Sequence, residues 1–320
     1  MKFVYVLTST KGDYYLEQAI LSMHSLRMYN PDAHIILITE KKTIESLSEG
    51  RERIHEYLSE LIDVKIPERF TPMQKSRYLK TSMRKYIKGD FLFIDTDTII
   101  CEPLDDLKIL RGDMYAVLDY HQPIYNNSAK RQIHSIARKI GWNIPEDEKY
   151  YNSGVMWIKD SISTHKLFED WHRNWLDGVE RLKINIDQPM LALANAQNHY
   201  IIKELNGNYN CQIICNGLKY LFNAKIIHYF ASGIDSSSTC PYILRDKNIY
   251  SYIRKYGIDE RIENILKISK SAFSERCLII GNESSLLYGE PLVSIARRIS
   301  IKFPLINSLL YKILKKIGRI

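Results

Sequence analysis

Two aspartates separated by one residue follow a short apolar run in the first third of the chain. Residues 91–94 are Phe-Leu-Phe-Ile, and Asp95 and Asp97 come directly after them. A run this apolar is typical of a strand covered on both faces of a sheet, and alternation along an extended chain places both carboxylates on the same side. Magnesium and manganese prefer oxygen ligands and commonly bind substrate phosphates as well. The pair therefore indicates a divalent cation at a nucleotide-diphosphate site, although an Asp-rich turn would have the same composition.

The segments around this pair alternate between strand and helix patterns. Strands are expected at residues 3–8, 34–39, 62–66 and 90–94. Helices are expected between them, at residues 14–28, 44–61 and 74–87. Such alternation predicts a largely parallel sheet with right-handed crossovers. Ligands bind beyond the carboxyl ends of the strands in folds of this kind, which is where the aspartates would lie.

The second half of the chain continues with less regular patterns. Strands are expected at residues 114–119, 155–158 and 225–229, and helices at 164–178 and 187–197. Residues 120–150 are polar and are expected to form an irregular, functional loop. We divide the chain into a catalytic domain at residues 1–235, an extension at 236–290 and a tail at 291–320.

The cysteines favour a reducing environment. The chain has 320 residues, 45% of them hydrophobic, which is ample for a core. Its five cysteines are an odd number without disulfide-framework spacing, and no signal-peptide pattern precedes the first expected strand. Cys211 and Cys215 lack a second Cys/His pair at zinc spacing, so we expect buried thiols. We therefore expect a cytoplasmic location.

The basic residues are distributed unevenly, which bears on the partners of this chain. The formal net charge is +8, from 45 lysine and arginine residues and 37 aspartate and glutamate residues. Seven of the basic residues and none of the acidic ones lie in residues 291–320, so the remaining body has 38 basic against 37 acidic residues. A body this close to neutral has no surface suited to follow a nucleic-acid backbone. We expect no nucleic-acid partner.

Residues 291–320 combine their basic charge with an apolar stripe. Leucine and isoleucine recur at spacings of three and four residues from Leu305 to Ile317, and the lysines lie largely off that stripe. This pattern is typical of a basic amphipathic helix in a membrane interface, although a terminal helix packed on the core would also show it. Charges interrupt every stretch long enough to span a bilayer. We favour an anionic membrane surface as the partner, with the protein peripheral on the inner face of the membrane.

Four segments stand in an order that resembles a known enzyme family. They are residues 6–14, residues 76–79, the aspartate pair with residues 91–104, and a late set made of residues 151–156, 187–188 and 227–229. In this order they resemble the glycosyltransferases of the GT-A fold, most closely family 8, which includes glycogenin and bacterial lipopolysaccharide galactosyl- and glucosyltransferases. The resemblance covers roughly residues 3 to 230. It implies a Rossmann-like α/β fold with a mixed, mainly parallel sheet flanked by helices, followed here by a basic helical tail.

The resemblance also implies a role for each matching residue. The nucleotide-sugar would be held by Thr8, Thr10, Asp13, Tyr14, Arg77 and Asp95. The metal, Mn²⁺ or Mg²⁺, would be held by Asp95, Asp97 and His228. Contacts to the sugars and catalysis would come from Asn152, Asp187, Gln188 and Asp119. Ordinary first-turn capping remains an alternative for the first loop, as does a solvated basic helix face for Arg77.

The activity implied is transfer of a hexose from a UDP-sugar to a glycan or lipid-linked acceptor, with retention, in surface polysaccharide or lipopolysaccharide synthesis. One departure from the family concerns the diphosphate: the lysine that family members carry after the histidine is missing from residues 229–235. A sugar nucleotidylyltransferase is an alternative, although residues 8–14 lack its glycine-rich basic loop. A non-catalytic glycan-binding or scaffold protein is another. The donor sugar, acceptor, linkage and oligomeric state have no readable code in the sequence.

Overall fold

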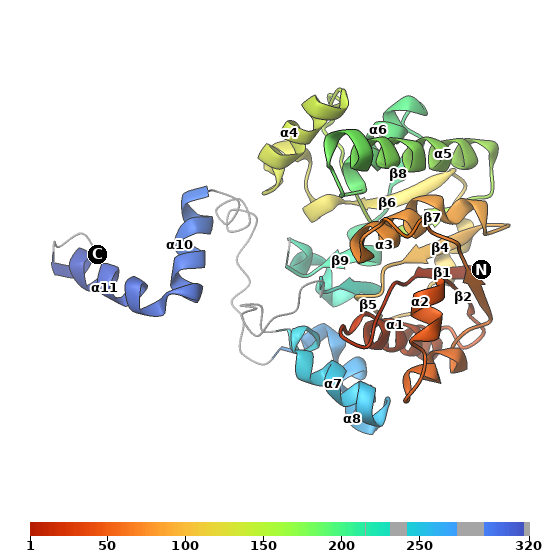
Figure 1. Cartoon of the computed structure of the whole chain (residues 1–320), viewed down its shortest axis with the longest axis horizontal. Coiled ribbons are helices and arrows are strands. Elements are labelled where there is room, and N and C mark those ends of the chain that lie inside the picture. The colour runs from red at the N-terminus through yellow and green to blue at the C-terminus, as the bar shows by residue number, and fades with distance from the viewer. Residues whose placement is uncertain (215, 231–241, 274–290, 317–320) are drawn as a thin grey trace.

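A seven-stranded sheet forms the centre of the molecule (Figure 1). The computed structural model describes residues 1–214, 216–230, 242–273 and 291–316. The strands, in spatial order, are β3 (Glu60–Asp63), β2 (His34–Thr39), β1 (Lys2–Val6), β4 (Phe91–Ile94), β7 (Tyr151–Ile158), β6 (Met114–Leu118) and β8 (Ile202–Glu204). Only the pairings of β7 with β4 and β6 are antiparallel. The expected mixed, mainly parallel sheet is confirmed.

The strand order has a topological switch point beside β1, because β2 and β3 are added on one side of β1 and β4 on the other. From β1 the sheet extends through β2 and β3 on one side and through β4 on the other, and both neighbours run parallel to it. The loops after β1 and β4 therefore leave the same edge of the sheet. Such a switch point is where open α/β sheets bind ligands. The aspartate pair follows β4 and lies at this edge.

Alternating side chains of the central strands feed two separate cores. Phe91 and Phe93 enter the cluster that contains α3 (Pro72–Ser82) and α5 (Ile162–Asp177), whereas Leu92 and Ile94 enter the cluster that contains α1 (Tyr15–Tyr29). All four side chains are fully buried. A strand covered on both faces needs this uninterrupted apolar run, as the sequence predicted.

A second, smaller sheet carries the late histidine. It consists of β5 (Thr98–Ile100), β10 (Ile226–His228) and β9 (Cys211–Gln212), with β10 in the middle. β10 runs antiparallel to β5 and pairs His228 with Thr98. Because β5 begins one residue after Asp97, this pairing fixes the histidine beside the aspartates.

The extension after residue 241 packs against the same body. Its helices α7 (Lys247–Tyr256) and α8 (Glu260–Lys267) contribute Tyr250 and Ile262 to a core cluster shared with Leu21 of α1. Burial of such side chains stabilises a fold by roughly 1.5 to 3 kcal/mol each. This segment is therefore held by a core that it shares with α1 and the smaller sheet.

One helix prediction and one loop prediction are wrong. The helix expected at residues 44–61 is broken into α2 (Lys41–Glu45) and the 3₁₀ helix η1 (Arg51–Glu56), because Glu49 and Gly50 adopt positive φ angles of 59° and 89° between them. A turn of this kind uses the freedom of glycine. The loop expected at residues 120–150 contains the helix α4 (Lys130–Ile140), whose apolar face packs in a small cluster with Trp142.

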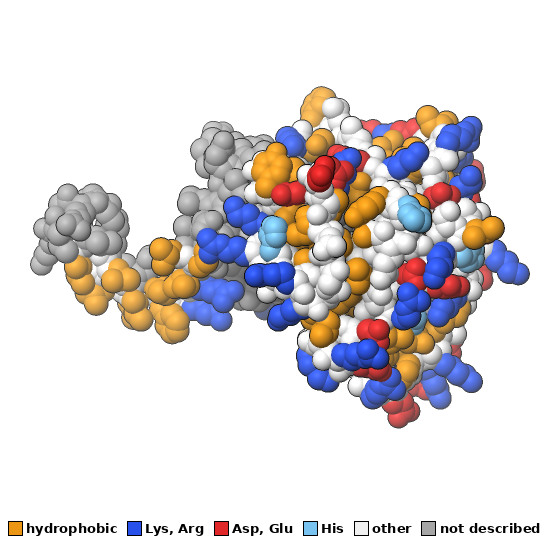
Figure 2. All heavy atoms as spheres, turned by 90° about the horizontal axis from the view of Figure 1, so that it is seen from above, with side chains coloured by type: hydrophobic (Ala, Val, Ile, Leu, Met, Phe, Trp, Pro, Cys, Tyr) orange, Lys and Arg blue, Asp and Glu red, His pale blue; other side chains and the backbone are white. Residues whose placement is uncertain are grey.

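The tail forms two helices where one was expected. α10 (Pro291–Lys302) and α11 (Pro304–Lys316) are separated at Phe303, because a proline cannot donate to the preceding turn. Both helices extend away from the body (Figure 1), and Figure 2 shows their described apolar side chains exposed beside basic ones. Leu292 and Leu305 are 81% and 85% exposed. Within the described residues, no helix is both long and apolar enough to cross a bilayer.

Candidate active site

Asp95, Asp97 and His228 converge at the carboxyl edge of β4. Each offers one ligand atom, and these atoms all lie within 4.8 Å of one another. The Nε2 atom of His228 is 3.2 Å from Oδ1 of Asp97. His228 is buried, whereas the two aspartates are partly exposed. The three residues predicted to hold a metal are thus brought together, and their two carboxylates and one imidazole are a donor set that suits Mn²⁺.

Asn210 determines which nitrogen of His228 faces the aspartates. Nδ1 of His228 lies 3.0 Å from Oδ1 of Asn210. Because that oxygen can only accept, Nδ1 donates to it, and Nε2 is the ring nitrogen that faces Asp97. The ring of Phe230 stacks on the imidazole with the centroids 4.0 Å apart and the planes 16° apart. The histidine is therefore held in the orientation and tautomer of a metal ligand.

A chain of buried amides continues from Asn210 to Asp119. Nδ2 of Asn210 donates to Oδ1 of Asn152 at 2.9 Å, and Nδ2 of Asn152 donates to Oδ1 of Asp119 at 3.0 Å. Asn127 donates to the other oxygen of Asp119 at 3.4 Å. Asn152 and Asp119, which were predicted at the sugar, are thereby connected to His228. Asn210 and Asn127 were missed, because a lone asparagine in a loop has no pattern that marks it.

The strand β7 approaches His228 so closely that a side chain has no room. A Cβ on Gly154 would lie 2.4 Å from Cε1 of His228 and 2.9 Å from its Nδ1. The amide N–H of Gly154 also donates to Oδ1 of Asn152 at 2.9 Å. Glycine is therefore required here by the imidazole, at a position where β-structure alone would accept any residue.

Arg77 and Asp187 form an ion pair at the edge of the site. Nε of Arg77 is 2.9 Å from Oδ1 of Asp187, which precedes α6 (Gln188–Gln197). Oδ2 of Asp187 accepts from Ser153 at 3.2 Å. Burial tends to raise the pKa of Asp187, but the charges of Arg77 and Lys80 outweigh it, so the pKa is lowered. Asp187 is therefore ionised near neutral pH, with a partner on each oxygen.

Lys80 is a site residue that was missed. Its Nζ lies 3.1 Å from both carboxylate oxygens of Asp95 and 4.0 Å from Oδ2 of Asp187, and its side chain is 3% exposed. Burial raises the pKa of Asp95, and Lys80 opposes that rise. Lys80 stands one helical turn after Arg77 in α3, on the same face, and that spacing could have revealed it.

Asp119 lies at a bend of unusual backbone geometry. Burial raises the pKa of Asp119, although the amides of Asn152, Gln188 and Asn127 oppose the rise. The next two residues, Tyr120 and His121, have φ angles of 56° and 55°. Conformations of this kind persist where the surroundings enforce them, and they cluster at ligand sites.

The loop after β1 folds its predicted binding groups into itself. The carboxylate of Asp13 accepts from Oγ of Ser9 at 2.6 Å and from the amide and hydroxyl of Thr10 at 2.8 and 2.9 Å. Thr8 donates to the carbonyl of Pro72 at 3.4 Å. Thr8, Thr10 and Asp13 therefore fix the shape of the loop and its contact with α3.

Tyr14 and Tyr15 point to different surroundings. The hydroxyl of Tyr14 is 2.7 Å from Oγ of Ser251, and Arg254 lies over the Tyr14 ring at 4.7 Å, so this predicted nucleotide residue packs on α7. Tyr15 is 37% exposed, and its pKa is raised by partial burial and by the charges of Asp13 and Asp97. Tyr15 is thus the aromatic ring of this pair that lies near the aspartates.

A cation from the extension lies beside the segment that follows His228. Nη1 of Arg245 donates to the carbonyl of Tyr229 at 2.6 Å and to that of Phe230. Phe230 has a φ angle of 50°. Arg245 therefore fixes the segment whose phenyl ring stacks on the histidine. Part of the stretch that lacks the expected lysine, residues 231–235, lies outside the described residues.

Comparisons with solved structures show the fold. The galactosyltransferase LgtC, in complex with donor and acceptor sugar analogues, has a TM-score of 0.51 and 16% identity over 82% of this chain and 99% of LgtC. A variant of LgtC with an active-site glutamine replaced by glutamate has a TM-score of 0.51 and 15% identity, over 84% of this chain and 100% of that one. The chain has a GT-A glycosyltransferase fold.

A curated sequence relative points in the same direction. Glycosyltransferase GlyA of Streptococcus pneumoniae serotype 4 is 24% identical over 243 residues. The match covers 71% of this chain but only 31% of the relative's length. No family model matches the chain. The expected resemblance to GT-A glycosyltransferases is confirmed.

Proposed function

We propose that this chain is a metal-dependent glycosyltransferase that moves a hexose from a UDP-sugar to a glycan or lipid-linked acceptor. The observation that carries the proposal is the convergence of Asp95, Asp97 and Nε2 of His228 at the carboxyl edge of a GT-A sheet. Two carboxylates and one imidazole form a mixed set of ligands that suits a cation such as Mn²⁺. The hydrogen bond from Nδ1 to Asn210 supports it, because it prepares the histidine for a cation before one binds.

The chemical requirement is to break the bond between the sugar C1 and a diphosphate. A bound Mn²⁺ or Mg²⁺ would stabilise the charge that builds on the diphosphate oxygens. Arg77 pairs with Asp187, is about one third exposed, and feels the charges of Asp95 and Asp97, so its guanidinium would contribute positive charge to the donor site. Lys80 holds Asp95 in position through both carboxylate oxygens. These two cations offset the three carboxylates gathered at the site.

Retention of the anomeric configuration is part of the proposal, by front-side attack. A double displacement would need Asp187 or Gln188 as a free nucleophile. Both oxygens of Asp187 have partners, and Gln188 accepts from the amide of Ser153 at 3.3 Å. Because Asp187 and Gln188 already have hydrogen-bond partners, we propose that they orient sugar hydroxyls. Asp119, which accepts a hydrogen bond from Asn152, would do the same.

The tail would bring the enzyme to its acceptor. Leu305, Leu309 and Ile313 of α11 are exposed, and no acidic residue lies in residues 291–320 to repel an anionic lipid. An apolar helix face with adjacent lysines binds such an interface through burial and charge together. We propose docking on an anionic membrane at its inner face, with a lipid-linked acceptor for a surface polysaccharide or lipopolysaccharide.

Binding of UDP to the full chain, measured by calorimetry with and without Mn²⁺, tests the proposal. We expect binding that depends on Mn²⁺ in the native protein and in Asp105→Asn, a matched change at an exposed aspartate of the 3₁₀ helix η3 (Asp105–Ile109). We expect Mn²⁺-dependent binding to be lost in Asp97→Asn. Equal binding by all three proteins would contradict it. Product formation only from a nucleoside triphosphate and a sugar 1-phosphate would instead indicate a nucleotidylyltransferase.

A further inference from the structure

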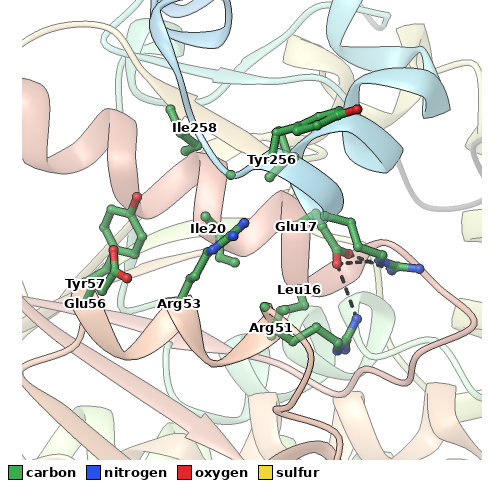
Figure 3. Close-up of a pocket in the computed structure, with 13 residues that line it drawn as sticks. Leu16, Glu17, Ile20, Arg51, Arg53, Glu56, Tyr57, Tyr256 and Ile258 are labelled. Atoms are coloured by element: carbon green, nitrogen blue, oxygen red, sulfur yellow. Dashed lines mark hydrogen bonds and ion pairs between the residues drawn. The ribbon is translucent and has the colours of Figure 1, made fainter.

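A cavity of about 220 Å³ lies between α1, η1 and α7, separate from the aspartate pair. Figure 3 shows it with the side chain of Arg53 directed into the space between the three elements. Its walls are partly apolar and partly aromatic, formed by Leu16, Ile20, Ile253, Ile258, Tyr57 and Tyr256. Its charged lining residues are Glu17, Arg51, Arg53, Glu56 and Arg254. Cavities of this mixed character, apolar with a few polar groups, are typical of small-molecule sites.

The three arginines of the cavity differ in how far they are engaged. Arg51 donates to Glu17 and Ser9, and Arg254 donates twice to Glu17, at 2.8 and 2.9 Å. Glu17 is thus neutralised by two cations. Arg53, by contrast, makes no hydrogen bond or ion pair within the described part of the chain, and its Nη1 is buried without a partner. Among the three arginines of the cavity, Arg53 is therefore the one whose charge no described carboxylate pairs with, and an anion bound in the cavity would offset that charge.

Two glycines let the backbone approach this guanidinium closely. A Cβ on Gly257 would lie 3.1 Å from Nη1 of Arg53, and a Cβ on Gly50 would lie 3.8 Å from its Cζ. Both glycines have positive φ angles, of 81° and 89°, which other residues rarely adopt. The backbone on both sides of Arg53 is therefore shaped so that no side chain occupies the space beside its charge.

We propose that this cavity is a second ligand site, which binds a small organic anion. The phosphate or carboxylate of the ligand is received by Arg53, and its apolar or aromatic part packs between Tyr57, Tyr256 and the aliphatic wall. Glu17 does not repel the anion, because Arg51 and Arg254 hold it in two ion pairs. A metal cation is disfavoured, because three arginines line the cavity against two glutamates, Glu17 and Glu56.

The site is connected to the nucleotide loop through Arg254. Nε and Nη2 of Arg254 donate to Glu17. Its Nη1 donates to the carbonyl of Lys11 at 2.9 Å, and its Nη2 also donates to the carbonyl of Asp13. The same guanidinium covers Tyr14. A ligand that shifts Arg254 or Glu17 therefore shifts the loop after β1, and its binding must be coupled to nucleotide binding. This coupling rests on the proposed function, whereas the anion site does not.

Binding of two probes to the full chain, without nucleotide or metal, tests the anion site. Phenyl phosphate and benzoate carry the two candidate groups on the same ring, and their difference shows which group is preferred. We expect saturable binding of at least one probe to the native protein and to Arg111→Gln, a matched loss of an exposed arginine. We expect binding about tenfold weaker or more in Arg53→Gln, as for loss of a charged hydrogen bond. Binding of neither probe, or equal binding by all three proteins, would overturn the site.

The coupling is measured by titrating UDP with Mn²⁺ in the presence and absence of the probe that binds. We expect the apparent affinity for UDP to change about fivefold or more in the native protein and to stay unchanged in Arg53→Gln, in the range of ordinary allosteric coupling. An unchanged affinity in the native protein would refute the coupling. Failure of UDP to bind under any condition would contradict the proposed function, while the probe titrations would still decide the anion site.

Discussion

Replacing Gly154 with alanine tests whether the imidazole of His228 acts where the structure places it. A Cβ at this position lies 2.4 Å from Cε1 of His228, whereas ordinary contacts begin at 3.4 Å. The ring must therefore move by about 1 Å, since the other close neighbour, Oδ1 of Asn152 at 2.9 Å, is held by two donors. The strand β7 cannot retreat easily, because it pairs with both β4 and β6.

The expected size of the effect follows from the tolerance of metal sites. Ligand distances in such sites are held to about 0.2 Å, so a movement of about 1 Å removes Nε2 from the ligand set. Disturbing only an outer partner of a ligand typically lowers metal affinity 10- to 100-fold. Loss of the ligand itself should be at the upper end, so we expect Mn²⁺ binding about 100-fold weaker in Gly154→Ala.

Isothermal titration with Mn²⁺ in the presence of UDP measures this change. Val155→Ala is the control, because it removes buried methyl groups from the same strand without adding an atom near His228. In the double variant Gly154→Ala/His228→Ala, we expect the alanine at position 154 to cause no further loss of Mn²⁺ affinity. Both changes remove the same interaction, the contact of His228 with the cation. Native Mn²⁺ affinity in a folded Gly154→Ala would refute the geometry, and additive losses would show that the clash acts elsewhere.

Three other outcomes follow from the structure. Asn210→Ala should weaken Mn²⁺ binding about 10- to 100-fold by titration, because it removes the acceptor that orients His228; an unchanged affinity would contradict that role. Burial lowers the pKa of His172 in the folded protein to about 4. Below pH 6.5 the unfolded chain therefore binds a proton at His172 that the folded protein does not bind until about pH 4. The free energy of unfolding should fall by about 2 kcal/mol between pH 7 and pH 5 from this residue. Urea unfolding of His172→Gln should lack that part of the decrease; the same decrease in both proteins would exclude His172 as its source. Deleting residues 291–320 should abolish sedimentation with anionic liposomes, with neutral liposomes as the control, and retained sedimentation would contradict membrane docking.

The parts of the site that the sequence could predict are those with a local pattern or a family resemblance. Asp95 and Asp97 follow an unbroken apolar run, which predicted their place at the end of β4. His228 lies in the smaller sheet, and only the family resemblance predicted that it would meet the aspartates. Asn210 has no such pattern, because its role depends on a contact across 18 residues of separation. Lys80 was recognisable as a cation one turn from Arg77, but its burial depends on the packing of α3 on the sheet.

Two further differences between prediction and structure concern Tyr14, at the start of α1, and the helix α4. The loop predicted to hold the nucleotide ends at Tyr14, α1 begins at Tyr15, and successive residues at the start of a helix point about 100° apart. Tyr14 therefore faces α7 while Tyr15 faces the aspartates. The helix α4 was missed although Ile133, Ile136 and Ala137 recur at helical spacing, because the whole polar stretch around them was interpreted as an irregular loop.

Hydrolysis of UDP-hexoses by the full chain with Mn²⁺ tests the central claim most directly, because it requires the nucleotide site, the cation and the sugar contacts together. The account predicts slow release of UDP from at least one UDP-hexose, dependent on Mn²⁺. It predicts release about 100- to 1,000-fold slower in Asp97→Asn, since a cation contributes several kcal/mol to such a transition state, and native rates in Asp105→Asn. Donor hydrolysis that proceeds equally without Mn²⁺, or at the native rate in a folded Asp97→Asn, would contradict it.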